Sequence, residues 1–200
     1  VREALDGATV ARLKSGDPAV FGRLDEETEA LREAGVPFDV TPGVTAASSA
    51  AASFGVSLTR RGRNGAFRLL TGHDVSGFAE QDWRTLARSG SQAAVYMGLR
   101  AARFLSGRLL MHGADPQTPV AIAENASRPE EKLFRTTLAA LPDALAEQKA
   151  EGPSVLLIGI DAPEAVDDER RSARCPAGAA IETGPRSFHD TPSHSLEAAQ

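Results

Sequence analysis

Apolar and polar positions alternate in blocks along the first 160 residues, and these blocks predict strands and helices in turn. Short apolar runs predict strands at 9–13, 36–40, 67–71, 93–97, 119–123, 132–136 and 154–160. Helical spacing predicts helices at 2–6, 26–34, 46–54, 81–88, 100–112 and 138–150. The run at 154–160 is continuously apolar, which is typical of a central strand, and 132–136 is expected to pair antiparallel with 119–123. The pattern predicts an α/β fold.

The ends of several helices carry recognisable signals. Asp25 is placed to cap the helix at 26–34, and Gly35 is placed to end it. The helix at 46–54 consists almost entirely of alanine and serine and ends at Gly55. Such small side chains predict close approach by a neighbouring backbone or by a ligand, and tight helix packing alone explains them equally well.

Composition changes along the chain predict its domain organisation. Residues 1–58 form the remainder of a first α/β lobe, 59–65 form a short basic linker, and 66–161 form a second α/β lobe. Residues 162–200 are rich in alanine, proline, serine, glycine and charge and show no sustained periodicity. We therefore expect them to be a disordered tail.

The totals exclude several classes of protein. The chain has 200 residues, 42% of them hydrophobic and 24% charged, as in a soluble globular protein, and its net charge of -5 argues against general nucleic-acid binding. Cys175 is its one cysteine, so a disulfide framework and a thiolate metal cluster are excluded, and we expect a reducing cytoplasm and no metal site. No long apolar stretch or signal pattern predicts membrane insertion or secretion.

Four polar or glycine-containing turns follow predicted strands, at 15–18, 41–43, 71–73 and 96–98. In open α/β sheets, ligands bind beyond the carboxyl ends of the strands, so this shared position predicts a ligand cleft. Scattered turn chemistry is the alternative. None of the turns has the GxGxxG or GxxxxGK[ST] spacing, which argues against an ordinary dinucleotide or phosphate loop.

These turns also carry a family resemblance. The motifs LKSGDP (13–18) with FGR (21–23), PGVTAAS (42–48), TGH (71–73) and YMG (96–98) resemble, in this order, those of the tetrapyrrole methylases. The resemblance covers about residues 2–160. It implies a two-lobed fold with a mixed sheet in the second lobe. It also implies an S-adenosylmethionine-dependent C-methyltransferase that converts uroporphyrinogen III to precorrin-2 for siroheme or cobalamin synthesis, as a cytoplasmic homodimer.

The resemblance assigns a set of cofactor-binding residues: Ser15, Gly16, Asp17, Val20, Thr45, Ala46, Met97 and Ala126. Two of them depart from the family, which commonly has glycine where this chain has Ser15 and Ala126. The family's first strand, its Gly-Pro-Gly-Asp turn and its proton-transferring aspartate and lysine have no counterpart before Val1. The first lobe is therefore expected to be incomplete, and the catalytic acid and base stay unknown.

A tetrapyrrole substrate carries many carboxylates and needs cationic partners, which guanidinium groups provide in bidentate form. Five residues are candidates for this role: Arg23, Arg60, Arg61, Arg63 and His73. A solvated surface charge is the alternative for each arginine, and the preferred one for Arg100. Without the resemblance, Tyr96 is best explained as a core residue.

Three other functions stay open at this level. One is methylation of a later corrin intermediate, since substrate choice depends on loops. Another is a truncated, noncatalytic remnant that binds S-adenosylmethionine weakly, because missing strands would expose sheet edges and apolar faces. The third is a flexible-tailed interaction protein, which rests only on residues 161–200.

Overall fold

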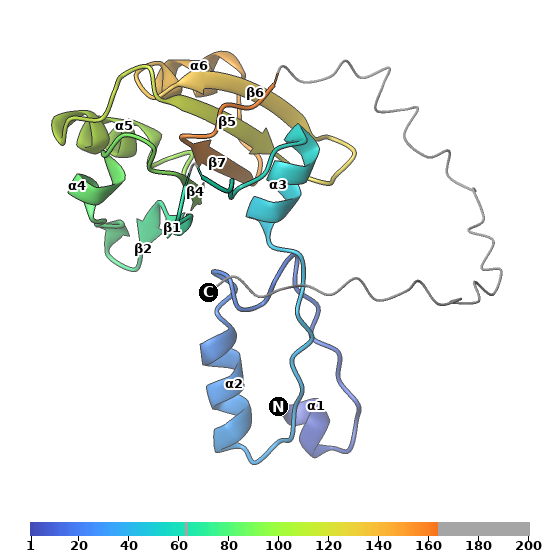
Figure 1. Ribbon diagram of the computed structural model, residues 1–200. Coiled ribbons are helices and arrows are strands. Elements are labelled where there is room, and N and C mark those ends of the chain that lie inside the picture. Colours follow the sequence, from blue (N-terminus) through green and yellow to red (C-terminus); the bar gives the residue numbers. More distant parts are fainter. Residues whose placement is uncertain (63, 164–200) are drawn as a thin grey trace, which may run out of the picture. The chain divides into compact units, whose positions relative to one another are not determined.

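A computed structural model describes residues 1–62 and 64–163, and their helices and strands alternate along the chain as an α/β protein (Figure 1). The described residues lie in one compact unit that extends from Val1 to Ala165. The elements in chain order are α1 (Arg2–Leu5), α2 (Leu24–Glu33), α3 (Ala46–Phe54), β1 (Arg68–Thr71), β2 (His73–Asp74), β3 (Gly77–Phe78), α4 (Trp83–Leu86), β4 (Ala93–Tyr96), α5 (Ala102–Met111), β5 (Pro119–Glu124), β6 (Lys132–Thr137), α6 (Leu141–Glu147) and β7 (Ser154–Ile158).

Five of the strands form one mixed sheet, in the order β1-β4-β7-β5-β6. Strands β1 and β4 are parallel, whereas β7 pairs antiparallel with β4 and β5, and β6 pairs antiparallel with β5. The central position of β7 and the antiparallel pairing of β5 with β6 confirm two predictions from the sequence. The short strands β2 and β3 form a separate hairpin.

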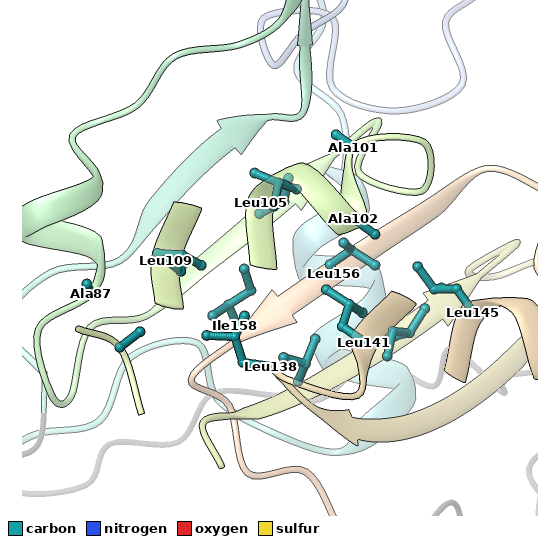
Figure 2. Packing of buried hydrophobic residues seen from close by; sticks show 14 of the residues in the cluster. Ala87, Ala101, Ala102, Leu105, Leu109, Leu138, Leu141, Leu145, Leu156 and Ile158 are labelled. Carbon is teal, nitrogen blue, oxygen red and sulfur yellow. The ribbon is translucent and has the colours of Figure 1, made fainter. Parts of the chain in front are cut away.

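The central strands are mostly apolar because both faces of the sheet are covered. On β7, Leu156 and Ile158 face a cluster that includes Leu105 of α5 and Leu141 of α6 (Figure 2). Val155 and Leu157 face the other way, toward α3. That second face is lined largely by alanines of α3, β4 and β5, so the helix packs close to the sheet: Ala47, Ala50, Ala94, Ala121 and Ala123. The small-residue helix predicted at 46–54 is thus a packing helix.

Two predicted strands are wrong. Residues 9–13 and 36–40 do not belong to any sheet of the described chain, although both contain β-branched residues. A strand exists only where its backbone groups pair with a neighbour, and neither segment has a ladder partner among the described residues. Val10, Leu13 and Val40 are consequently exposed.

The predicted helices are confirmed, with differences at their ends. Helix α2 begins at Leu24 after Arg23, which adopts a left-handed backbone conformation, so Asp25 lies in the first turn and is not the cap. There its carboxylate lies near the positive end of the helix dipole, which stabilises the helix. Gly55 ends α3 with φ +66°, as predicted. Helix α4 is shorter than expected and begins after Asp82, whose side chain accepts a hydrogen bond from the Thr85 N–H.

Some predictions fall outside the described residues. Arg63 and residues 164–200 belong to this group, so the predicted tail is described only at its start. Ala162 is buried and packs against the α3 face of the sheet. The division into lobes at 1–58 and 66–161 stays a prediction. Within the described part, no helix has both the length and the apolar character that a membrane span requires.

Candidate functional site

Two of the four predicted turns follow the parallel strands β1 and β4 and lie at the same edge of the sheet. Thr71 and Tyr96 are register partners, so the turns 71–73 and 96–98 leave the sheet together. They approach so closely that a Cβ on Gly72 would lie 2.7 Å from the carbonyl oxygen of Met97. Glycine is therefore required at position 72.

The other two turns, at 15–18 and 41–43, contact each other. Asp17 Oδ2 accepts a hydrogen bond from the Gly43 N–H at 3.1 Å, while Oδ1 accepts one from the Ala19 N–H at 2.8 Å. A Cβ on Gly43 would lie 2.7 Å from the Gly16 carbonyl oxygen. The Asp17 carboxylate thus joins the two turns and gives each a fixed backbone shape.

Tyr96 connects the two pairs of turns. Its hydroxyl accepts a hydrogen bond from the Ala47 N–H at 3.0 Å, in the first turn of α3, and is hydrogen-bonded to the Thr45 hydroxyl. The Phe21 ring packs against the Tyr96 ring, with centroids 4.9 Å apart. Residues from the loop at 18–23, the start of α3 and the end of β4 therefore meet at one side chain.

These contacts surround one cleft of about 690 Å³. All eight predicted cofactor-binding residues line it: Ser15, Gly16, Asp17, Val20, Thr45, Ala46, Met97 and Ala126. Arg23 and His73 line it as well, whereas Arg60 and Arg61 are not among its lining residues. A cleft of this volume accommodates a nucleotide-sized molecule.

Met97 is held in a strained conformation at the edge of this cleft. Its φ is 53°, in the left-handed region that a bulky side chain rarely adopts, and the residue is half exposed. His73 Nδ1 lies 3.0 Å from the Met97 carbonyl oxygen and donates a hydrogen bond to it. The His73 ring also makes an edge contact with Phe78. His73 thus holds the backbone of Met97 in addition to any contact it makes with a ligand.

The loop at 125–128 forms another wall. Asn125 has φ 52°, and its N–H donates to the Pro153 carbonyl at 2.8 Å. Glu131 Oε2 accepts hydrogen bonds from the Ser127 N–H at 2.6 Å and the Ser53 hydroxyl at 2.9 Å, which attaches the loop to α3. Ala126 is therefore presented to the cleft by a loop whose backbone is fixed on both sides.

Glu124, a buried carboxylate behind this wall, is 3% exposed. Its Oε1 accepts hydrogen bonds from the Glu151 N–H at 2.9 Å and the Gly152 N–H at 2.6 Å, and Lys132 Nζ lies 3.6 Å from Oε2. Burial, the largest effect, raises the pKa of Glu124, but the two N–H groups and Lys132 together outweigh it and hold the pKa below its ordinary value. Glu124 is thus an anion that fixes the 151–153 loop, which also lines the cleft.

The cations around the cleft fall into two groups. Lys14 donates hydrogen bonds to Glu27 at 2.6 Å and to the Gly22 carbonyl at 2.7 Å. The hydrogen bond between Lys14 and Glu27 is the main reason that the pKa of Glu27 is lowered. Arg23 forms a two-pronged pair with Glu26. Arg100 and Arg128 also line the cleft, and no ion pair is formed by either within the described residues. These two arginines are available to a carboxylate ligand.

A family model described as Tetrapyrrole (Corrin/Porphyrin) Methylases matches residues 1–142. The chain belongs to the tetrapyrrole methylase family. The resemblance predicted from the four turns and the α/β fold with a mixed sheet are both confirmed. S-adenosylmethionine is the methyl donor of this family, which confirms the predicted cofactor.

Several relatives in the family are similar over most of this chain. The siroheme synthase 2 of Cronobacter sakazakii is 45% identical over 159 residues, which are 80% of this chain and 34% of that protein. The siroheme synthase of Vesicomyosocius okutanii is 40% identical over 156 residues, 78% of this chain and 34% of that protein. The chain thus spans about a third of the length of these curated relatives.

Solved structures of tetrapyrrole methylases share the fold. The uroporphyrin-III C-methyltransferase of Thermus thermophilus in complex with S-adenosylhomocysteine is 37% identical, with a TM-score of 0.64 over 79% of this chain and 68% of that chain. A cobalt precorrin-4 methyltransferase of cobalamin biosynthesis is 26% identical, with a TM-score of 0.73 over 79% of this chain and 66% of that chain.

Several residues that line this cleft were not predicted as site residues from the sequence: Lys14, Phe21, Tyr96, Arg100, Asn125 and Arg128. The position of Tyr96 directly before Met97 was a sign that Tyr96 lies at the cleft, but its place in an apolar strand favoured a role in the core. Tyr96 is in fact buried and also presents its hydroxyl to Thr45. Among the residues that the structure describes, no three His, Cys, Asp or Glu side chains are grouped as metal ligands would be.

Proposed function

We propose that the cleft binds S-adenosylmethionine and that the chain is a C-methyltransferase that converts uroporphyrinogen III to precorrin-2. One observation supports this most strongly: the eight residues assigned to the cofactor come from separate parts of the sequence, and all of them line a single cleft. A chance resemblance would scatter them over the surface. The similar Thermus thermophilus protein, named as a uroporphyrin-III C-methyltransferase, supports the choice of substrate.

The residues of the cleft suit such a ligand. Asp17, Thr45 and the backbone of Gly16 provide polar groups, while Val20, Ala46 and Ala126 provide an apolar wall. A mixed lining of this kind can orient an amphipathic nucleoside and exclude water from its reactive end. When bound, S-adenosylmethionine supplies an electrophilic methyl group on a sulfonium, so the chain's own task is alignment.

The tetrapyrrole side of the proposal depends on charge. Arg23 and His73 line the cleft, as the predicted carboxylate partners should, and Arg100 and Arg128 add two further cations. Arg23 is already paired with Glu26, so a carboxylate ligand must compete for it. We assign no general acid or base. The roles predicted for Arg60, Arg61 and Arg63 stay predictions.

Incubation of the full chain with uroporphyrinogen III and S-adenosylmethionine, followed by mass analysis of the tetrapyrrole, tests this function. Mass increments of whole methyl groups are the expected result. Unchanged uroporphyrinogen III despite measurable binding of S-adenosylhomocysteine would favour the noncatalytic alternative.

A second candidate function is methylation of a later corrin intermediate. The TM-score of 0.73 with a cobalt precorrin-4 methyltransferase favours it. Offering a precorrin in place of uroporphyrinogen III separates the two, since only the true substrate gains methyl groups. The homodimer and the cytoplasmic location stay predictions, and sedimentation of the purified chain checks the first.

A further inference from the structure

Tyr96 is the last residue of β4 and the chain's single tyrosine. The residue is 9% exposed at the edge of the cleft, and its hydroxyl contacts the Thr45 hydroxyl, just before α3, and the Ala47 N–H in its first turn. We propose that Tyr96 is a positioning residue, whose hydroxyl orients the Thr45 hydroxyl so that Thr45 presents a hydrogen-bond donor to the ligand. The inference rests on the proposed binding of an S-adenosyl ligand.

The hydrogen-bond donors and acceptors at this contact support the assignment. A phenol has one proton and accepts through its oxygen. The Ala47 N–H donates to the Tyr96 oxygen at 3.0 Å, so the phenol proton needs a separate acceptor, and Thr45 Oγ1 is the one that the structure provides. In the opposite arrangement, with Thr45 donating, the described residues offer no acceptor for the buried phenol proton, which is costly.

This arrangement orients the Thr45 hydroxyl toward a ligand. When Tyr96 donates to Thr45 Oγ1, the Thr45 hydroxyl proton is free to be donated elsewhere, and Thr45 lines the cleft. An oxygen or nitrogen acceptor of a bound ligand then completes the chain from Ala47 through Tyr96 and Thr45. Such a chain strengthens each of its bonds, because every donor polarises the next.

The Tyr96 ring is itself held in place. Phe21 packs against it at 4.9 Å between centroids, and its β4 neighbour Ala94 lies on the same alanine-lined face as α3. A side chain held by packing presents its hydroxyl without a further loss of rotamer entropy on binding. Tyr96 thereby links the sheet to Thr45, which precedes α3.

A double-mutant cycle on the full chain tests this inference, with S-adenosylhomocysteine as the probe and calorimetric titration as the measurement. We expect Tyr96→Phe and Thr45→Val each to weaken binding by roughly three- to tenfold, the range of one hydrogen bond. The double variant should bind no more weakly than Thr45→Val alone, because Tyr96 acts through Thr45. Thr45→Ser keeps the hydroxyl, so adding Tyr96→Phe to this variant should again weaken the binding of S-adenosylhomocysteine.

Ser106→Ala is the matched control. Ser106 also has a buried hydroxyl, which donates to the Leu138 carbonyl at 2.7 Å, but it is not among the cleft-lining residues. We expect this variant to lower the melting temperature and leave the affinity for S-adenosylhomocysteine unchanged. It therefore separates a general loss of stability from a loss of positioning.

A spectroscopic measurement keeps the inference testable even if Tyr96→Phe unfolds. With one tyrosine, 13Cζ-tyrosine labelling gives a single tyrosine resonance that reports on the hydroxyl. Thr45→Val should shift it and Ser106→Ala should not. Absence of saturable binding by the unaltered chain would overturn the proposed function. Two results would overturn only the role of Tyr96. One is unchanged binding in Tyr96→Phe. The other is that Tyr96→Phe weakens binding equally in the parent chain and in Thr45→Val.

Discussion

The sheet with α3, α5 and α6, here called the sheet core, and residues 1–45, here called the leading segment, contribute to the same cleft but are stabilised differently. The sheet core has a continuous apolar interior on both faces. In the leading segment, all of which is described, Pro18 and Thr28 are the only buried residues, and its contacts are mainly polar. Part of the cleft therefore lies on this packed core, and part lies on loops fixed by individual hydrogen bonds.

The largest expected effect comes from the interior of the sheet core. Leu156→Ala should reduce the free energy of unfolding by about 3 kcal/mol, because Leu156 is fully buried and leaves a cavity. Leu13→Ala, in the leading segment, should change it by less than about 0.5 kcal/mol, because Leu13 is 82% exposed. Urea unfolding followed by circular dichroism measures both, and equal losses would break the comparison.

Glu124 gives the next largest effect, and it depends on pH. Glu124→Gln should cost about 1–3 kcal/mol at neutral pH, since the buried anion accepts two N–H bonds. The folded pKa is lowered, so this contribution is present above the unfolded value of about 4.3 and is lost as the pH falls through the folded pKa.

Unfolding curves measured from neutral to acid pH check this prediction. The difference between the parent chain and Glu124→Gln should shrink toward acid pH, and a constant difference would exclude an ionised Glu124. Exposed Glu130, changed to Gln, is the control, and it should alter stability little at any pH.

Asp17 tests the leading segment through binding. Asp17→Ala removes the acceptor for the Ala19 and Gly43 N–H groups and should weaken S-adenosylhomocysteine binding roughly tenfold while unfolding changes little. Asp39→Ala removes the same charge from an exposed site in the same segment and should leave binding unchanged. Matching losses in the two variants would mean that net charge, and not the geometry of the turns, decides the affinity.

The smallest effect is expected at Lys14. Lys14→Met removes the hydrogen bonds to Glu27 and the Gly22 carbonyl and should lower the melting temperature slightly, by less in high salt, because part of the contribution is an ion pair. Thermal melts at two salt concentrations measure it. A loss as large as that of Leu156→Ala would show that the leading segment is stabilised more strongly than its burial indicates.

The sequence predicted the sheet core well, because burial on both faces leaves a signal. The unbroken apolar run that contains β7 and the alanines of α3 identify a central strand and a close-packed helix. Residues 9–13 show a similar local pattern, but whether a strand forms depends on a partner elsewhere in the chain, which a local pattern does not contain.

The cleft was predicted in part. Asp17, Thr45 and Met97 were accessible to sequence reasoning because each follows a turn with a recognisable motif. Arg100 and Arg128 were not, since a charge on a helix or loop carries no sign of the side on which it will lie. Arg60 and Arg61 were selected because a basic run suggests a carboxylate partner; they are not among the residues that line this cleft, and their role stays a prediction.

Calorimetric titration of the full chain with S-adenosylhomocysteine tests the central claim most directly, namely that the sheet core and the leading segment together form one cofactor cleft. We predict saturable binding of one ligand per chain, weakened by Asp17→Ala in the leading segment and by Tyr96→Phe in β4 of the sheet core. Titrations without saturable heat, or an affinity that neither substitution changes, would contradict the claim of one shared cleft.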